Sequence, residues 1–149
     1  MADAYLTALT MLGSRELSEV QLRTRLKRRK FEPDDIDDAI GRLKQDGTLN
    51  DKRVALAAAR LESTIRHRGR ARVLQKIRQL GIEGATAESA VTEVFAEVDE
   101  TAILDRALER RLRGKSPQDL DEKGRARIVR ALVGQGFSIE AILKRMRLQ

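Results

Sequence analysis

A ten-residue hydrophobic pattern recurs three times along the chain. Two aliphatic residues four positions apart are followed by a lysine or glycine and then by a large apolar residue, over residues 22–31, 73–82 and 128–137. The final apolar positions of the three copies lie 51 and 55 residues apart. A period of this length is typical of a helical unit stacked on copies of itself, so the pattern predicts tandem repeats and favours a modular binding protein.

The spacing of apolar residues, and the residues that favour helix N-termini, predict three helices in each repeat. Ser18 and Gln21, for example, have the form of a capping box. The expected helix starts are Asp3, Ser18 and Pro33; Asn50, Gly69 and Thr86; and Asp99, a position after the loop at 114–120, and Ser138. The strongest apolar stripe follows Asn50 and comprises Val54, Ala57, Ala58, Leu61 and Ile65.

The sequence thus predicts an all-α fold of three tandem three-helix repeats, each resembling a helix-turn-helix core, in an elongated, curved array. We place the repeats at residues 1–48, 49–98 and 99–149. The chain has only two prolines and is rich in residues that favour helices, which agrees with this fold class. A unit of about 50 residues buries little apolar surface alone, so we expect neighbouring repeats to share cores.

The charge of the chain indicates an anionic partner. The formal net charge is +7 and the isoelectric point is near 10.2, and basic runs cover residues 23–30, 66–78 and 106–130. Charge is also segregated: the middle helix of each repeat is the most basic, and the third helices of the first two repeats are acidic. The predicted contact residues on the middle helices are Arg23, Arg25, Lys27, Arg28, Arg70, Arg72, Lys76, Arg125, Arg127 and Arg130. Aromatic residues are scarce, so we expect contacts with DNA mainly at phosphates.

Candidate catalytic groups are few. His67 is the only histidine and there is no cysteine, so one chain cannot assemble a catalytic triad, a histidine pair for a metal or a thiolate zinc site. The acidic residues at 34–38 are an alternative magnesium site for a nuclease, but acids in the first turn of a helix also offset its dipole. We therefore expect a non-enzymatic protein without a cofactor or metal.

No apolar run approaches the roughly 18 residues of a membrane span, and the N-terminus lacks a signal core. We expect a cytoplasmic protein that does not bind membranes. A capped repeat array gives no reason for oligomerisation, so we also expect a monomer.

Several segments, in this order, resemble the RecX family, the small regulators of the RecA recombinase. They are residues 8–12, 14–22 (Ser-Arg-Glu-Leu-Ser-Glu-Val-Gln-Leu), 47–55, 80–82 (Leu-Gly-Ile) and 132–137. The resemblance covers nearly the whole chain, and the family's fold is the same array of three-helix units. It implies a protein that enters the groove of the RecA–DNA filament and contacts RecA protomers, with single- or double-stranded DNA as a further partner. Recombinase, ATPase and co-protease activities would fall as a result. The alternative is a stand-alone basic DNA-binding protein that docks helix-turn-helix modules on a duplex.

Overall fold

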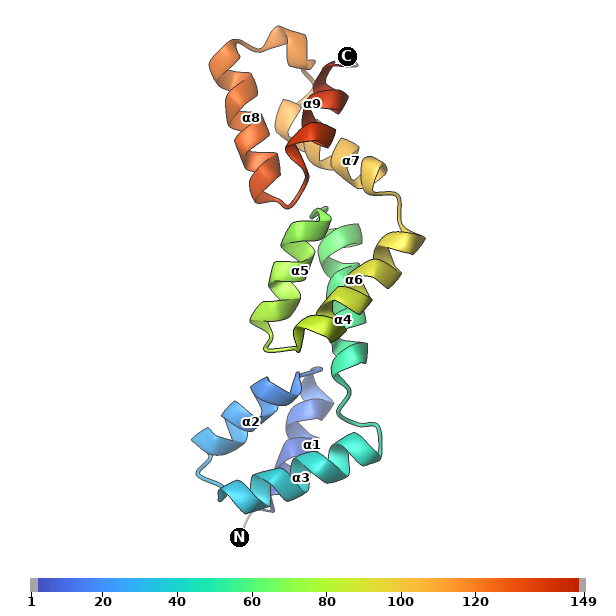
Figure 1. Cartoon of the computed structure of the whole chain (residues 1–149). Helices are drawn as coiled ribbons and strands as arrows, with labels where there is room; N and C mark the ends of the chain where they lie inside the picture. The colour runs from blue at the N-terminus through green and yellow to red at the C-terminus, as the bar shows by residue number, and fades with distance from the viewer. Residues whose placement is uncertain (1–2, 148–149) are drawn as a thin grey trace.

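The computed structural model describes residues 3–147, and within this range it contains helices and no strand. The elements, in chain order, are α1 (Ala4–Ser14), α2 (Glu19–Arg28), α3 (Pro33–Gln45), α4 (Asp51–Arg60), the π-helical turn η1 (Leu61–Ile65), α5 (Arg70–Gln79), α6 (Gly84–Glu97), α7 (Glu100–Leu112), the 3₁₀ turn η2 (Pro117–Asp119), α8 (Glu122–Gly134) and α9 (Ile139–Arg147). The α-helices fall into three successive groups, α1–α3, α4–α6 and α7–α9, and Figure 1 shows these groups in an elongated, curved array. The predicted fold class is confirmed.

The recurring hydrophobic pattern supplies the centre of each repeat. Its first two aliphatic residues are buried in every copy, as Leu22 and Leu26 are in α2. The first repeat has an apolar core of its own, around α1, α2 and α3. The second and third repeats form a single continuous core, so core sharing is confined to these two repeats.

Most of the expected helix starts are capped as the sequence indicates. Asp3, Asn50 and Asp99 accept a hydrogen bond from a backbone N–H in the first turn of the following helix, and Ser18 forms the predicted capping box. Thr86 is not a cap, because α6 begins two residues earlier.

The predicted apolar stripe after Asn50 is wrong for most of its members: Val54 is buried and Ala58 partly buried, but Ala57 is exposed. Leu61 and Ile65 are 43% and 66% exposed, whereas Ala59, Glu62 and Ser63 are buried. The buried residues, Ala55, Ala59, Glu62 and Ser63, keep helical spacing, so the buried face of the helix lies one position away from the predicted face. Over the π-helical turn η1, which continues α4, this places Glu62 in the interior and Leu61 and Ile65 on the surface.

Candidate partner and nucleic-acid interface

The second and third repeats are joined through backbone groups, where the start of α5 meets the end of α8. The N–H groups of Gly69 and Ala71 donate to the carbonyls of Gln135 and Gly136, at 2.8 and 3.3 Å. A Cβ on Gly69 would lie 2.5 Å from the Gly136 carbonyl, and a Cβ on Gly136 would lie 2.4 Å from the backbone nitrogen of Arg72. The first N–H groups and last C=O groups of a helix lack partners within it, so α5 and α8 cap each other here.

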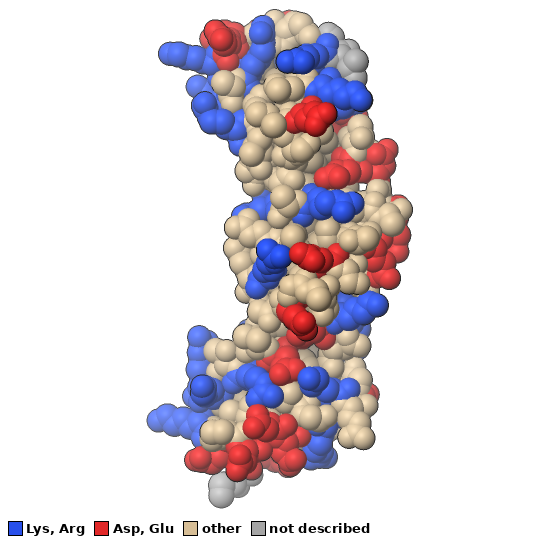
Figure 2. All heavy atoms as spheres, viewed as in Figure 1, with Lys and Arg blue, Asp and Glu red and all other residues tan. Residues whose placement is uncertain are grey.

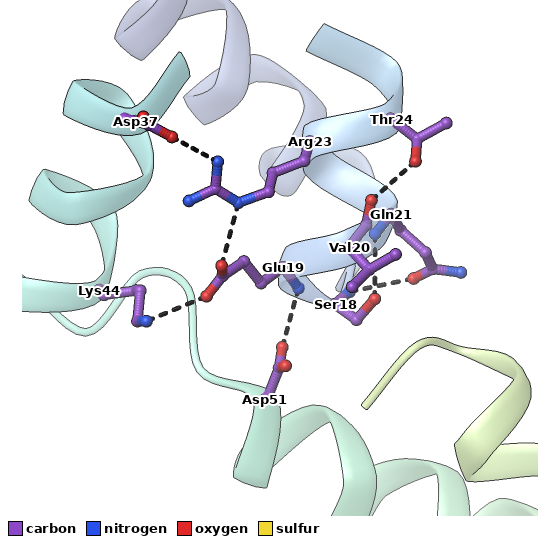
Figure 3. Close-up of polar contacts among 9 residues, drawn as sticks. All are labelled: Ser18, Glu19, Val20, Gln21, Arg23, Thr24, Asp37, Lys44 and Asp51. Carbon is purple, nitrogen blue, oxygen red and sulfur yellow. Dashed lines mark hydrogen bonds and ion pairs between the residues drawn. The ribbon is translucent and has the colours of Figure 1, made fainter. Parts of the chain in front are cut away.

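The first and second repeats are joined in a related way, at the start of α2 and the end of α5. The buried Ser18 hydroxyl donates to the Leu80 carbonyl and also accepts from the Gln21 N–H, at 3.1 Å. Beside it, the Glu19 N–H donates to the Asp51 carboxylate at 2.8 Å (Figure 3). The capping box predicted from the sequence is therefore also part of the joint between the repeats.

The two joints place the three middle helices end to end along one edge of the molecule. Figure 1 shows α2, α5 and α8 in succession on this edge, which is concave in the space-filling view of Figure 2. Lys and Arg side chains protrude at both ends of the edge, with Asp and Glu side chains beside them (Figure 2).

One of the ten predicted contact residues, Arg23, is held inside its own repeat. Its guanidinium contacts the carboxylates of Glu19 at 3.0 Å and Asp37 at 2.7 Å (Figure 3). The hydrogen bonds to Asp37 and then to Glu19 raise the pKa of Arg23. Partial burial raises the pKa of Glu19, but hydrogen bonds from Lys44 and Arg23 outweigh it, so this pKa lies below its ordinary value. The charge of Arg23 is therefore neutralised locally, between α2 and α3.

The other nine predicted residues are three on each middle helix. They are Arg25, Lys27 and Arg28 on α2; Arg70, Arg72 and Lys76 on α5; and Arg125, Arg127 and Arg130 on α8. The Arg70 guanidinium lies 5.3 Å from the centre of the Phe95 ring, and Arg125 Nε donates to the Pro117 carbonyl at 3.0 Å. Within residues 3–147 none of the nine forms an ion pair. Their charges are available to a partner.

A cavity of about 730 Å³ opens between the second and third repeats. Its walls are the segment 66–68, which follows η1, and the facing sides of α7 and α8. Seven of the fifteen described residues that line it are Arg or Lys, and none of the fifteen is Asp or Glu. Of the predicted contact residues, Arg127 alone belongs to this lining.

The remaining basic residues of the cavity were not predicted, because they lie outside the three middle helices that carry the predicted contact residues. They come from the segment 66–68, from the last turn of α7 and from the loop after it. A signal was present in the sequence, since four of the six residues at 110–115 are basic and none is acidic. What the sequence does not show is that this segment faces residues 66–68 across a cavity.

The residues considered for an enzymatic function are the acidic residues at 34–38 and His67, and the structure places them apart from each other. Asp34, Asp35 and Asp38 are exposed near the start of α3, and Asp37 contacts Arg23. Across residues 3–147, no group of three or more His, Cys, Asp or Glu side chains is placed to hold a metal ion. His67 lies in the lining of the basic cavity.

Comparison with known proteins identifies the family. A Pseudomonas entomophila protein named "Regulatory protein RecX" is 33% identical over 141 residues, which cover 91% of this chain and 84% of that protein. A Trichlorobacter lovleyi protein of the same name is 30% identical over 144 residues, with 95% and 92% covered. The chain belongs to the RecX family. The family model for the first three-helix domain of RecX matches residues 4–43, which contain α1, α2 and most of α3.

A solved structure of RecX, from Lactobacillus salivarius, has the same fold. Its TM-score against this chain is 0.84 at 19% identity, over 98% of this chain and 96% of that one. The RecX resemblance in the sequence is thereby confirmed in both family and fold.

No helix within residues 3–147 has the length and apolar character needed to cross a membrane.

Proposed function

We propose that this RecX-family protein is a non-enzymatic regulator that binds RecA and the RecA–DNA filament and inhibits the recombinase, ATPase and co-protease activities of RecA. The observation that carries the proposal is the concave basic edge formed by α2, α5 and α8. Membership of the RecX family supports RecA as the partner, and the basic edge supplies a surface of suitable charge and extent.

The arrangement of the edge suits a polymeric partner. The two joints hold three basic helices in a fixed order, so one molecule can make several separated contacts at once. When weak contacts are linked in this way, the later ones form at a high effective concentration, and overall affinity rises without a single deep pocket. A filament offers repeated binding positions along its length, which such an array can use.

The test is ATP hydrolysis by pre-formed RecA filaments on single-stranded DNA, titrated with this protein at low and high salt. We expect inhibition at amounts well below one molecule per RecA. A variant with one charge reversal on each middle helix, Arg28→Glu, Arg70→Glu and Arg130→Glu, should need much more protein for the same inhibition. The matched control is Lys52→Glu, Arg106→Glu and Lys144→Glu, which changes the net charge equally at residues of α4, α7 and α9.

Two results would contradict the proposal. If inhibition begins only when the protein saturates free DNA, the protein is a stand-alone DNA-binding protein, and RecA is not its partner. If the edge variant and the control inhibit equally well, the edge is not the contact surface. Both variants must melt near the wild-type temperature for this comparison to count.

A further inference from the structure

We infer that the cavity between the second and third repeats is a phosphate-binding site that takes the backbone of a single nucleic-acid strand. The inference deepens the proposed function and rests on it, because it assigns the DNA contact of a filament regulator to a particular site. The six arginines of the site are Arg66, Arg68, Arg110, Arg111, Arg113 and Arg127.

The first argument is the charge of the cavity. Among the residues that the structure describes, Arg66 is the one arginine of the six with an ion pair, at 2.8 Å to the buried carboxylate of Glu62. Arg111 donates at 3.5 Å to the neutral side chain of Gln135. Cations gathered without carboxylates repel one another, so this cluster opposes folding unless an anion occupies the space between them.

The second argument is that the same place has buried side-chain nitrogens without hydrogen-bond partners and residues with a strained backbone conformation. Within residues 3–147, His67 Nδ1 and Arg68 Nε are buried without a hydrogen-bond partner, and both side chains line the cavity. Such orphaned groups are rare and call for a specific explanation, for example a ligand. His67 and Arg113 also have φ values of 54° and 51°, a left-handed conformation that is costly for residues other than glycine.

The third argument identifies the anion. Arginine supplies six of the seven cations, and its planar guanidinium donates two parallel hydrogen bonds to phosphate, which lysine cannot do. Apolar side chains, including Leu112, Leu120 and Ile128, line the cavity beside the arginines and suit the sugars of a strand. The volume lies in the range of small-ligand sites, so one flexible strand can enter, whereas a duplex is too wide.

The fold holds the walls of the site in place. The segment 66–68 belongs to the second repeat, and α7 and α8 belong to the third. The hydrogen bonds of Gly69 and Ala71 to the end of α8 connect the two repeats directly beside the cavity. The Arg68 N–H also donates to the Glu62 carbonyl at 2.9 Å. The backbone segments that carry the cations are therefore in place before a ligand arrives, which lowers the cost of binding.

The test compares two double variants in which the same helices lose the same charge. Arg110→Gln with Arg127→Gln removes two cations of the cavity, whereas Arg106→Gln with Lys123→Gln removes two exposed cations one turn earlier on α7 and α8. Binding of a short fluorescent oligothymidylate is measured by anisotropy over a range of salt, without RecA. The cavity variant should bind at least about tenfold more weakly, because charged hydrogen bonds to phosphate are lost. The slope of log affinity against log salt should fall by about 1.4, since each lost contact with a single strand removes about 0.7. The control should stay close to the wild type.

A second measurement uses thermal unfolding with pyrophosphate, at constant ionic strength. The melting temperature of the wild type and of the control should rise with pyrophosphate, and that of the cavity variant should not. The melts also show whether the cavity variant is folded, and we expect it to be no less stable than the wild type without anion because two like charges are gone.

Three results would overturn the inference. If both variants lose affinity for the strand equally, only net charge matters and there is no site. If pyrophosphate stabilisation depends on the cavity but affinity for the strand does not, the site takes free phosphate compounds. If an oligoaspartate peptide competes as well as the strand, the ligand is an acidic protein segment. Because RecA is absent from these assays, their failure is distinct from a failure of the proposed function.

Discussion

Substitution of Gly136 by alanine tests whether the second and third repeats are joined through their backbones. Gly136 has a φ of 101°, a conformation that costs a residue with a Cβ about 1–3 kcal/mol. The new Cβ would lie 2.4 Å from the Arg72 backbone nitrogen and 2.7 Å from the Gly69 carbonyl oxygen. Backbone atoms cannot turn aside as the end of a side chain can, so α5 and α8 must move apart.

The size of the effect follows from these contacts. Separation of the two helices weakens the hydrogen bonds from Gly69 to Gln135 and from Ala71 to Gly136, and each is worth about 1 kcal/mol. Together with the backbone cost, the free energy of unfolding should fall by about 3–5 kcal/mol. For a chain of this length, that corresponds to a decrease in melting temperature of roughly 10 °C.

Thermal unfolding followed by circular dichroism measures this change, and Gly134→Ala is the matched control. Gly134 is the last residue of α8, and a Cβ at this position would meet no atom of a neighbouring element within 4 Å. Alanine there should be neutral, or stabilising by up to about 1 kcal/mol, because glycine disfavours the helix. If the two variants melt within about 2 °C of each other, the difference is below about 1 kcal/mol and the reasoning about the joint is wrong.

Two further predictions concern α2 and its neighbours. Ser18→Ala should lower the free energy of unfolding by about 2 kcal/mol, because α2 loses its cap and the Leu80 carbonyl loses its donor; urea unfolding checks this, and an unchanged midpoint contradicts it. Arg23→Ala should cost about 0.5–1 kcal/mol at neutral pH, since the ion pairs with Glu19 and Asp37 are half exposed. The pKa of Glu19 is lowered from 4.5, so its share of this stability is present above about pH 4.5 and is lost as the pH falls through the folded-state pKa. Urea unfolding near pH 7 and near pH 3 should thus show a smaller cost in acid, and an equal cost would refute the assignment.

The architecture could be predicted because it depends on periodic burial. Leu22, Val73 and Ile128 begin the three copies of the pattern, and each is buried at the centre of its repeat. The joints between repeats could not be predicted. The sequence does not show that Gly69 meets Gly136, because glycine usually marks a turn or a helix end and gives no signal of a distant partner.

For the candidate interface, the sequence could predict which helices are basic, but not which charges are paired with a neighbouring helix or face one another across a cavity. Arg23 has the same signature as its neighbours on α2, yet it contacts Asp37 on the adjacent helix. The cavity depends on residues 66–68 and 110–115 facing each other, which is a property of the joint. The exposure of Leu61 and Ile65 was missed because apolar residues occupy two neighbouring faces of this helix, and periodicity alone does not show which of the two faces packs.

The start of α5 shows how the joint and the basic edge depend on each other. Gly69 provides no side-chain cap, the first turn of α5 has no acid, and Arg70 and Arg72 lie there. Cations at this end of a helix oppose its dipole and would weaken an isolated helix. The carbonyls at the end of α8 and the carboxylate of Glu100 offset this cost. The carbonyls accept from the N–H groups of Gly69 and Ala71, and the carboxylate accepts from the N–H of Arg70 at 3.2 Å. The joint therefore allows Arg70 and Arg72 to occupy a position that the dipole of α5 alone disfavours.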